Sequence, residues 1–189
     1  MISVAEALDR LFALCPAPVT ERVALRHAAG RVLADDVVAG RDQPPFAASA
    51  MDGYAIRESD HRPGARLKVT GEAAAGKGFS GTVSQGEAVR IFTGAPVPAG
   101  AERVVLQEDV GREGEAILLS DRIGGGTNIR AAGQDFRAGD RIAAPRRLRP
   151  ADLALIAAMN VPEVTVARRP VVALIPTGDE LVMPGETPG

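Results

Sequence analysis

Apolar residues near the N-terminus recur at the spacing of an α-helix. Ser3 and Glu6 precede and open this segment with the Ser-x-x-Glu pattern of a capping box. Pro16 cannot continue a helix, because its ring excludes the backbone hydrogen bond and clashes with the preceding turn. The pattern therefore predicts a helix over residues 4–14.

From residue 19 onward the apolar positions indicate short strands separated by turns rich in glycine and proline. The predicted strands are residues 19–25, 32–38, 54–57, 66–70, 88–92, 103–107 and 116–119, with a helical turn at 26–30. The polar, glycine-containing segment 108–115 predicts a hairpin between the last two strands. Strands of this length and spacing are typical of a small antiparallel barrel or sandwich, which we place at residues 41–140.

Helical periodicity returns at Pro150, a residue favoured at the first position of a helix, and Asn160 is a plausible terminator. A strand is predicted at residues 164–166. The resulting fold class is α/β plus mostly β, with a β domain at 41–140 inserted into a discontinuous α/β linker domain made of residues 1–40 and 141–169. The sequence allows this arrangement without requiring it.

The segment from residue 171 to 175 is a continuous apolar run, Val-Val-Ala-Leu-Ile, typical of a parallel strand that is buried on both faces. Such a strand needs neighbours, and few residues follow it. We therefore expect residues 170–189 to be the first strand and loop of a truncated α/β domain.

Composition excludes several classes of function. With 24 acidic and 22 basic residues the net charge is -2, and aromatic residues make up 3% with no tryptophan, which argues against nucleic-acid binding. The lone cysteine excludes a disulfide framework, and the two distant histidines argue against a zinc site. No apolar run has the length of a membrane span, and residues 1–15 lack the features of a signal peptide, so a cytoplasmic protein without membrane contact is expected.

Four polar motifs place a hydroxyl or charged group beside glycine at the end of a strand. They are Ser49-Ala50-Met51-Asp52-Gly53-Tyr54, Thr93-Gly94-Ala95-Pro96, Asn128-Ile129-Arg130 with Gly133-Gln134-Asp135-Phe136, and Thr177-Gly178-Asp179-Glu180. Glycine lets backbone N–H groups approach an anion, and carboxylates bind hard cations. Each motif also has a plain structural interpretation: a turn cap at Asp52 or Asp135, a turn hydroxyl at Thr93, and a solvated ion pair at Arg130.

Together these motifs resemble the molybdopterin molybdotransferase family, which includes the E domain of gephyrin. The matching stretches also include Gly30-Arg31-Val32-Leu33-Ala34, residues 91–98 and Pro176-Thr177-Gly178-Asp179-Glu180-Leu181. They follow the family's order and span almost the whole chain. The run Ser-Ala-Met-Asp-Gly-Tyr-Ala at residues 49–55 is the most specific of them.

The resemblance implies an Mg²⁺-dependent reaction of adenylated molybdopterin with molybdate, which releases AMP as molybdenum enters the dithiolene. It places catalytic roles on Asp52, Thr93, Asp135 and Glu180. Substrate binding would fall on Arg130, Ser49, Gly94 and Thr177. Metal binding would fall on Asp52, Asp135 and Glu180, whose carboxylates suit Mg²⁺.

Three further expectations accompany the resemblance. Gln134 stands where the family usually has glutamate, which removes one charge and leaves an acceptor. The family forms homodimers, so a second copy of the chain is the expected partner. Because the family's later domains would follow Glu180, the chain by itself is expected to be inactive.

Two alternatives remain open from the residues. The chain could be a non-catalytic dimerisation or scaffold module of the same family. A stand-alone Mg²⁺-dependent phosphohydrolase is less favoured, because the sequence has no complete phosphate-binding loop of the Gly-x-x-x-x-Gly-Lys-Ser type.

Overall fold

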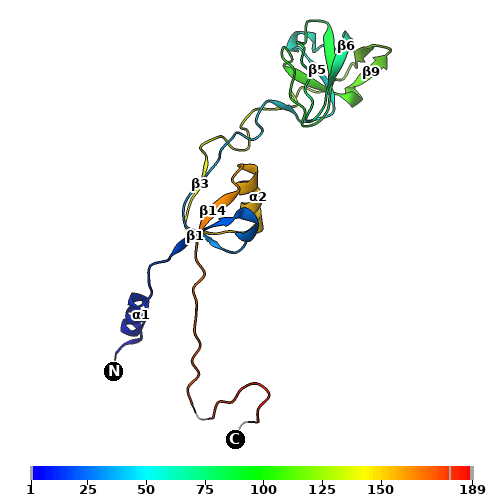
Figure 1. Ribbon diagram of the computed structural model, residues 1–189. Helices are drawn as coiled ribbons and strands as arrows, with labels where there is room; N and C mark the ends of the chain where they lie inside the picture. Colours follow the sequence, from blue (N-terminus) through cyan, green and yellow to red (C-terminus); the bar gives the residue numbers. More distant parts are fainter. Residues whose placement is uncertain (1, 179, 188–189) are drawn as a thin grey trace.

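The computed structural model describes residues 2–178 and 180–187, and this part of the chain is mostly β with two helices. Two bodies of secondary structure are joined by a pair of extended segments (Figure 1). We call them the four-stranded body and the six-stranded body, after their sheets. Helix α1 and the C-terminal segment project from the four-stranded body on the side opposite the six-stranded body.

The four-stranded body is built from both ends of the chain. Its strands are antiparallel and lie in the order β1 (Thr20–Ala24), β14 (Glu163–Ala167), β2 (Val32–Leu33) and β13 (Arg146–Arg147). Leu33, Ile156 and Val166 are fully buried in its core. The core therefore forms only when strands from early and late in the chain pair.

Helix α2 (Pro150–Ala158) packs against this sheet and matches the helix predicted at Pro150. The backbone N–H of Arg149 donates to Asp152 Oδ2 at 2.8 Å, which closes the first turn. Asn160 follows the helix with φ of 64°, a left-handed conformation that asparagine tolerates.

The six-stranded body is a curled, mixed sheet with a core cluster against each of its faces. Its strands lie in the order β8 (Arg103–Leu106), β5 (Gly53–Ile56), β7 (Glu87–Ile91), β6 (Arg66–Ala73), β10 (Ala116–Leu119) and β9 (Val110–Glu113). Tyr54 and Ile56 belong to one core cluster and Ala55, between them, belongs to the other. Successive side chains of a strand point to opposite faces, so β5 contributes to two cores.

Two predictions about this sheet are wrong. The strands β6 and β7 pair in parallel, although an antiparallel barrel or sandwich was expected. The predicted hairpin between residues 103–107 and 116–119 is also absent, because β8 pairs with β5 instead. A 3-10 turn at Gln107–Asp109 redirects the chain, and the hairpin forms between β9 and β10.

Two further strands differ from the sequence prediction. Residues 32–38 form two short strands, β2 and β3 (Val37–Val38), because Asp35 and Asp36 interrupt the run. No strand forms over residues 171–178, where Val171 is 95% exposed and Leu174 is 90% exposed. In the described part of the chain this apolar run has no neighbouring strand to cover it.

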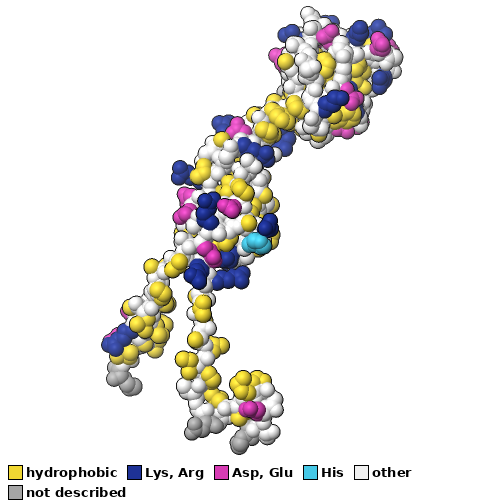
Figure 2. Space-filling model, in the orientation of Figure 1, with side chains coloured by type: hydrophobic (Ala, Val, Ile, Leu, Met, Phe, Trp, Pro, Cys, Tyr) yellow, Lys and Arg dark blue, Asp and Glu magenta, His cyan; other side chains and the backbone are white. Residues whose placement is uncertain are grey.

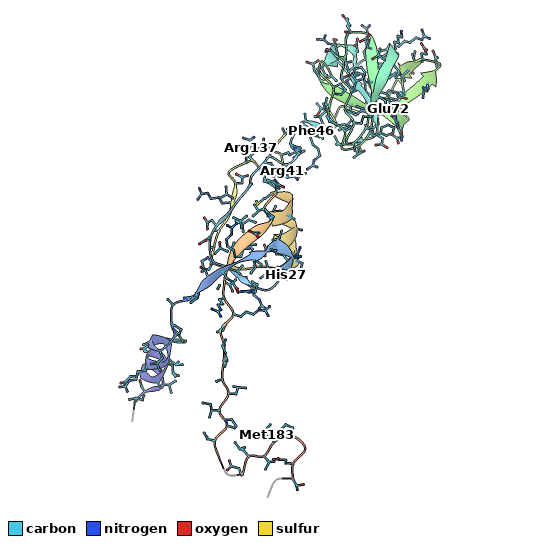
Figure 3. All side chains as sticks on the ribbon, in the orientation of Figure 1. His27, Arg41, Phe46, Glu72, Arg137 and Met183 are labelled. Atoms are coloured by element: carbon cyan, nitrogen blue, oxygen red, sulfur yellow. The ribbon has the colours of Figure 1, made fainter. Side chains whose placement is uncertain are left out.

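The segments that connect the two bodies run side by side. Strand β3 pairs with β12 (Arg141–Ile142), and Gln43 and Phe136 form a bridge farther along. Figure 3 shows Phe46 and Arg137 on these segments, between the two bodies. The chain thus enters and leaves the six-stranded body at one place.

Helix α1 (Val4–Ala13) forms as predicted, with Ser3 Oγ accepting the Glu6 N–H at 3.1 Å. None of its residues is buried, and Val4 and Phe12 are 79% and 69% exposed. Apolar side chains accordingly gather on α1 and on the C-terminal segment in Figure 2. Neither described helix is long and apolar enough to cross a membrane.

Candidate functional site

The structure brings Asp52 and Thr93 into direct contact. Asp52 Oδ1 accepts the backbone N–H of Thr93 at 2.8 Å and its hydroxyl at 2.7 Å. The pairing of β5 with β7 causes this contact, because Gly53 lies opposite Ile91 and the residues just beyond each strand end meet. Two motifs that are 41 residues apart in sequence thus form one polar cluster.

Hydrogen bonding keeps the Asp52 carboxylate ionised. The backbone N–H of Thr93, followed by its hydroxyl, lowers the pKa of Asp52 below the ordinary value of 3.8. Partial burial opposes this effect, and the positive charge of Arg90 adds to it. Thr93 engages Oδ1 only, so its bonds leave the second carboxylate oxygen for another partner.

Ser49 and Gly94 frame the contact from the backbone. The Gly94 N–H donates to the Ser49 carbonyl at 2.9 Å, and Gly94 has φ of 81°, which favours glycine. Ser49 is buried at 1% exposure, and its hydroxyl donates to the Met51 carbonyl at 2.6 Å. The Ser49 hydroxyl is therefore used inside the turn that carries Asp52.

Arg130 and Asp135 form an ion pair with each other, and both are partly exposed. Strand β11 (Ile129–Arg130) pairs with β4 (Ala48–Ser49), which brings Arg130 opposite Ala48. The third motif therefore lies beside the first. Gln134 accepts the Ala131 N–H at 3.1 Å through Oε1, so its side chain closes the turn between the two charged residues.

Thr177 and Glu180 are not brought to this cluster. They lie on the C-terminal segment, close in sequence to Met183, which Figure 3 places far from Phe46 and from Glu72 of the six-stranded body. Asp179, the third polar residue of this motif, lies outside the described residues. In the structure the fourth motif is thus separate from the other three.

The three carboxylates predicted to bind metal do not form one site. Among the described residues, no group of three or more Asp, Glu, His or Cys side chains is arranged to hold a metal ion. Asp52 and Asp135 can each offer oxygen ligands, but the other ligands of a Mg²⁺ ion would have to come from elsewhere. These residues alone do not fit a complete metal site.

Sequence reasoning missed Arg90, which contacts the backbone of the Asp52 turn. Its Nη1 donates to the Gly53 carbonyl at 3.1 Å. The available signal was a single arginine inside the otherwise apolar strand end Ala88-Val89-Arg90-Ile91-Phe92. A charged residue in a buried strand usually has a specific partner.

Comparisons with known proteins find related sequences over almost the whole chain. A molybdopterin molybdenumtransferase of Haemophilus influenzae is 36% identical, matching 98% of this chain and 47% of the relative. One from a Nostoc species is 38% identical, matching 96% of this chain and 44% of the relative. The chain spans about half the length of these curated relatives.

A solved structure shares the fold. The crystal structure of the molybdopterin biosynthesis moeA protein from Pyrococcus horikoshii matches with a TM-score of 0.85 and 38% identity, over 96% of this chain and 50% of that one. The family model of the MoeA N-terminal region, domains I and II, matches residues 2–160. The chain therefore belongs to the family of MoeA N-terminal regions.

Proposed function

We propose that this chain supplies one wall of a site that inserts molybdenum from molybdate into adenylated molybdopterin and releases AMP. The observation that carries the proposal is the contact between Asp52 and Thr93, which unites two of the motifs by which the chain resembles the molybdotransferases. The names of the relatives support a place in molybdenum cofactor biosynthesis.

The geometry suggests separate roles for the charged groups. The Thr93 hydroxyl donates its proton to Asp52, so the lone pairs of its oxygen can still accept a hydrogen bond. This arrangement suits the positioning of a water molecule between Thr93 and the second oxygen of Asp52. Arg130 keeps further N–H donors beyond its bond to Asp135, and a guanidinium matches the oxygens of phosphate or molybdate.

We place the remaining predicted residues as follows. Ser49 and Gly94 shape the backbone around the cluster, and substrate contact there would come from main-chain groups. Thr177 and Glu180 would join the site only after the C-terminal segment is bound by another part of a longer protein. The metal dependence implied by the family resemblance would use oxygens of Asp52, Asp135 or Glu180, together with ligands from elsewhere.

The domain organisation belongs to the same proposal. Residues 41–140 would be an inserted β domain, residues 1–40 with 141–169 the linker domain, and residues 170–189 the beginning of a further domain. The pairing of β1 with β14 and the adjacent entry and exit segments support the insertion. The exposed apolar run at 171–175 supports a further domain as its partner.

Binding of adenylated molybdopterin, measured with and without Mg²⁺, tests the proposal. We expect Asp52→Asn to weaken binding or its Mg²⁺ dependence, and Asp121→Asn, an exposed carboxylate in a loop, to change neither. The matching measurement is the rate of molybdenum insertion by the 189-residue chain and by a longer protein that also carries the second half of its relatives. Equal rates in the two proteins would contradict a shared site. If neither the 189-residue chain nor the longer protein binds adenylated molybdopterin, the proposed substrate is wrong.

The exposed face of α1 favours the second candidate function, a module for assembly. Val4, Leu11 and Phe12 are 79%, 59% and 69% exposed, and apolar surface of this kind is typical of contacts between chains. We expect the chain to sediment as a homodimer, and Leu11→Asp with Phe12→Asp to make it monomeric. A monomer at high concentration before any substitution would argue against this function.

A further inference from the structure

Arg90 lies between two aromatic rings beside the candidate site. Its guanidinium carbon is 5.1 Å from the centroid of the Tyr54 ring and 4.8 Å from that of Phe92. Both distances are within the range of a cation–π contact. Because Phe92 immediately precedes Thr93 in the chain, this stacking restrains the backbone that presents the Thr93 donors.

The same guanidinium also holds the Asp52 side of the contact. Nη1 donates to the carbonyl of Gly53, and Nη2 donates to Gln107 Oε1 at 2.5 Å. The Gln107 N–H in turn donates to the Asp52 carbonyl at 3.2 Å. Arg90 thus restrains the peptide between Gly53 and Tyr54 directly, and the peptide between Asp52 and Gly53 through Gln107.

We propose that Arg90 is a positioning residue, which sets the Asp52 carboxylate against the Thr93 donors by bracing both segments at once. A guanidinium can donate in two directions within its plane while its faces stack on rings, and the compact ammonium of lysine cannot reproduce this combination. The placement of Asp52 follows from the contacts of this chain. Its importance for catalysis rests on the proposed function.

Amide hydrogen exchange of Thr93, measured by NMR in the 189-residue chain, tests the placement. The Thr93 N–H donates to Asp52 Oδ1, so its protection reports the contact directly. We expect Arg90→Lys and Arg90→Gln each to reduce this protection by roughly tenfold. The control is Arg112→Gln, which removes an exposed arginine from the groove that Arg90 also lines.

Two results would overturn the placement. If Arg90→Lys keeps the protection of the parent chain, the charge alone suffices and the guanidinium geometry is irrelevant. If neither variant changes the protection, Arg90 does not brace the contact. Should Arg90→Gln fail to fold, Arg90→Lys and Gln107→Met, which removes the acceptor of Nη2, still decide between these outcomes.

The catalytic part has its own measurement, made in a protein that carries this chain and the second half of its relatives. We expect Arg90→Lys to lower kcat and to leave KM unchanged, because a positioning residue acts through Asp52 and Thr93 and contributes no substrate contact of its own. A raised KM with unchanged kcat would overturn the positioning role. If the parent protein inserts no molybdenum, the proposed function fails while the Thr93 protection result stands by itself.

Discussion

The position of Asp52 depends on the neighbouring Gly53 as well as on the hydrogen bonds of its own side chain. Gly53 opens β5 and lies between Ile91 of β7 and Leu106 of β8. A Cβ atom at this position would collide with the main-chain carbonyl of Val105, whose carbon would be 2.9 Å away. Backbone atoms cannot yield as a flexible side chain can, so the motif requires glycine here.

Gly53→Ala should therefore destabilise the chain by roughly 1–3 kcal/mol, as overpacked cores do. It should also weaken the Asp52–Thr93 contact, because β5 must move away from β8. Chemical denaturation and the NMR signal of the Thr93 amide measure the two effects. Gly111→Ala is the matched control, since nothing lies within 4 Å of its Cβ position. An equal loss of unfolding free energy in both variants would count against the steric argument.

Helix α2 depends on an ionised carboxylate at its first turn. The N–H of Arg149, followed more weakly by the Arg146 side chain, lowers the pKa of Asp152 below its ordinary value of 3.8, and burial opposes this. A carboxylate with a lowered pKa in the folded chain stabilises it above the ordinary pKa. This stabilisation is lost as the pH falls through the lowered value.

The pH dependence of Asp152→Asn follows from this sign. Its thermal midpoint should lie below that of the parent chain near neutral pH, and the gap should narrow as the pH falls below 3.8. Differential scanning calorimetry across this range measures the gap. Asp121→Asn serves as the control, and a gap that stays constant with pH would show that the charge of Asp152 is unimportant.

At the scale of elements, local signals predicted the helices and most strand positions. The Ser3 cap, Pro16 and Pro150 mark the helix ends through constraints that act within one turn. Pairing was less predictable, because an alternation of apolar residues does not say which strand lies alongside. The parallel pairing of β6 with β7 and the removal of β8 from the expected hairpin are failures of this kind.

Prediction of the geometry of the candidate site was also limited by what the sequence says about strand pairing. The residues Asp52, Thr93, Arg130 and Asp135 could be selected from the sequence through a family resemblance, but the contact between the first two depends on the register of β5 against β7. No local pattern encodes that register. Arg90 was missed because its partners are the Gly53 carbonyl and Gln107, which only the folded sheet brings near.

At the scale of the whole molecule, the four-stranded and six-stranded bodies have separate cores. Ile156 is buried in the first and Ile117 in the second, both at 0% exposure, and the two clusters share no residue. Truncation of a buried isoleucine to alanine costs about 2–5 kcal/mol. The two bodies should accordingly respond independently to such substitutions.

Calorimetry should show two transitions in the parent chain. Ile156→Ala should lower the midpoint temperature of only one transition, and Ile117→Ala that of only the other. In each case the free energy of unfolding of the affected body should fall by about 2–5 kcal/mol. Circular dichroism of α2 assigns the first transition to the four-stranded body, which contains this helix. A single transition that moves as a whole in both variants would mean that the two bodies unfold as one unit.

The pairing of β1 with β14 has a consequence for how the chain folds. These strands come from opposite ends of the sequence, so the four-stranded sheet must close a very long loop, and loop closure becomes less favourable as the loop lengthens. Once the six-stranded body has folded, its adjacent entry and exit segments shorten that loop to the stretches between β1 and β3 and between β12 and β14. The middle of the chain should therefore fold first. During synthesis, β1 should stay unpaired until residues 163–167 have left the ribosome.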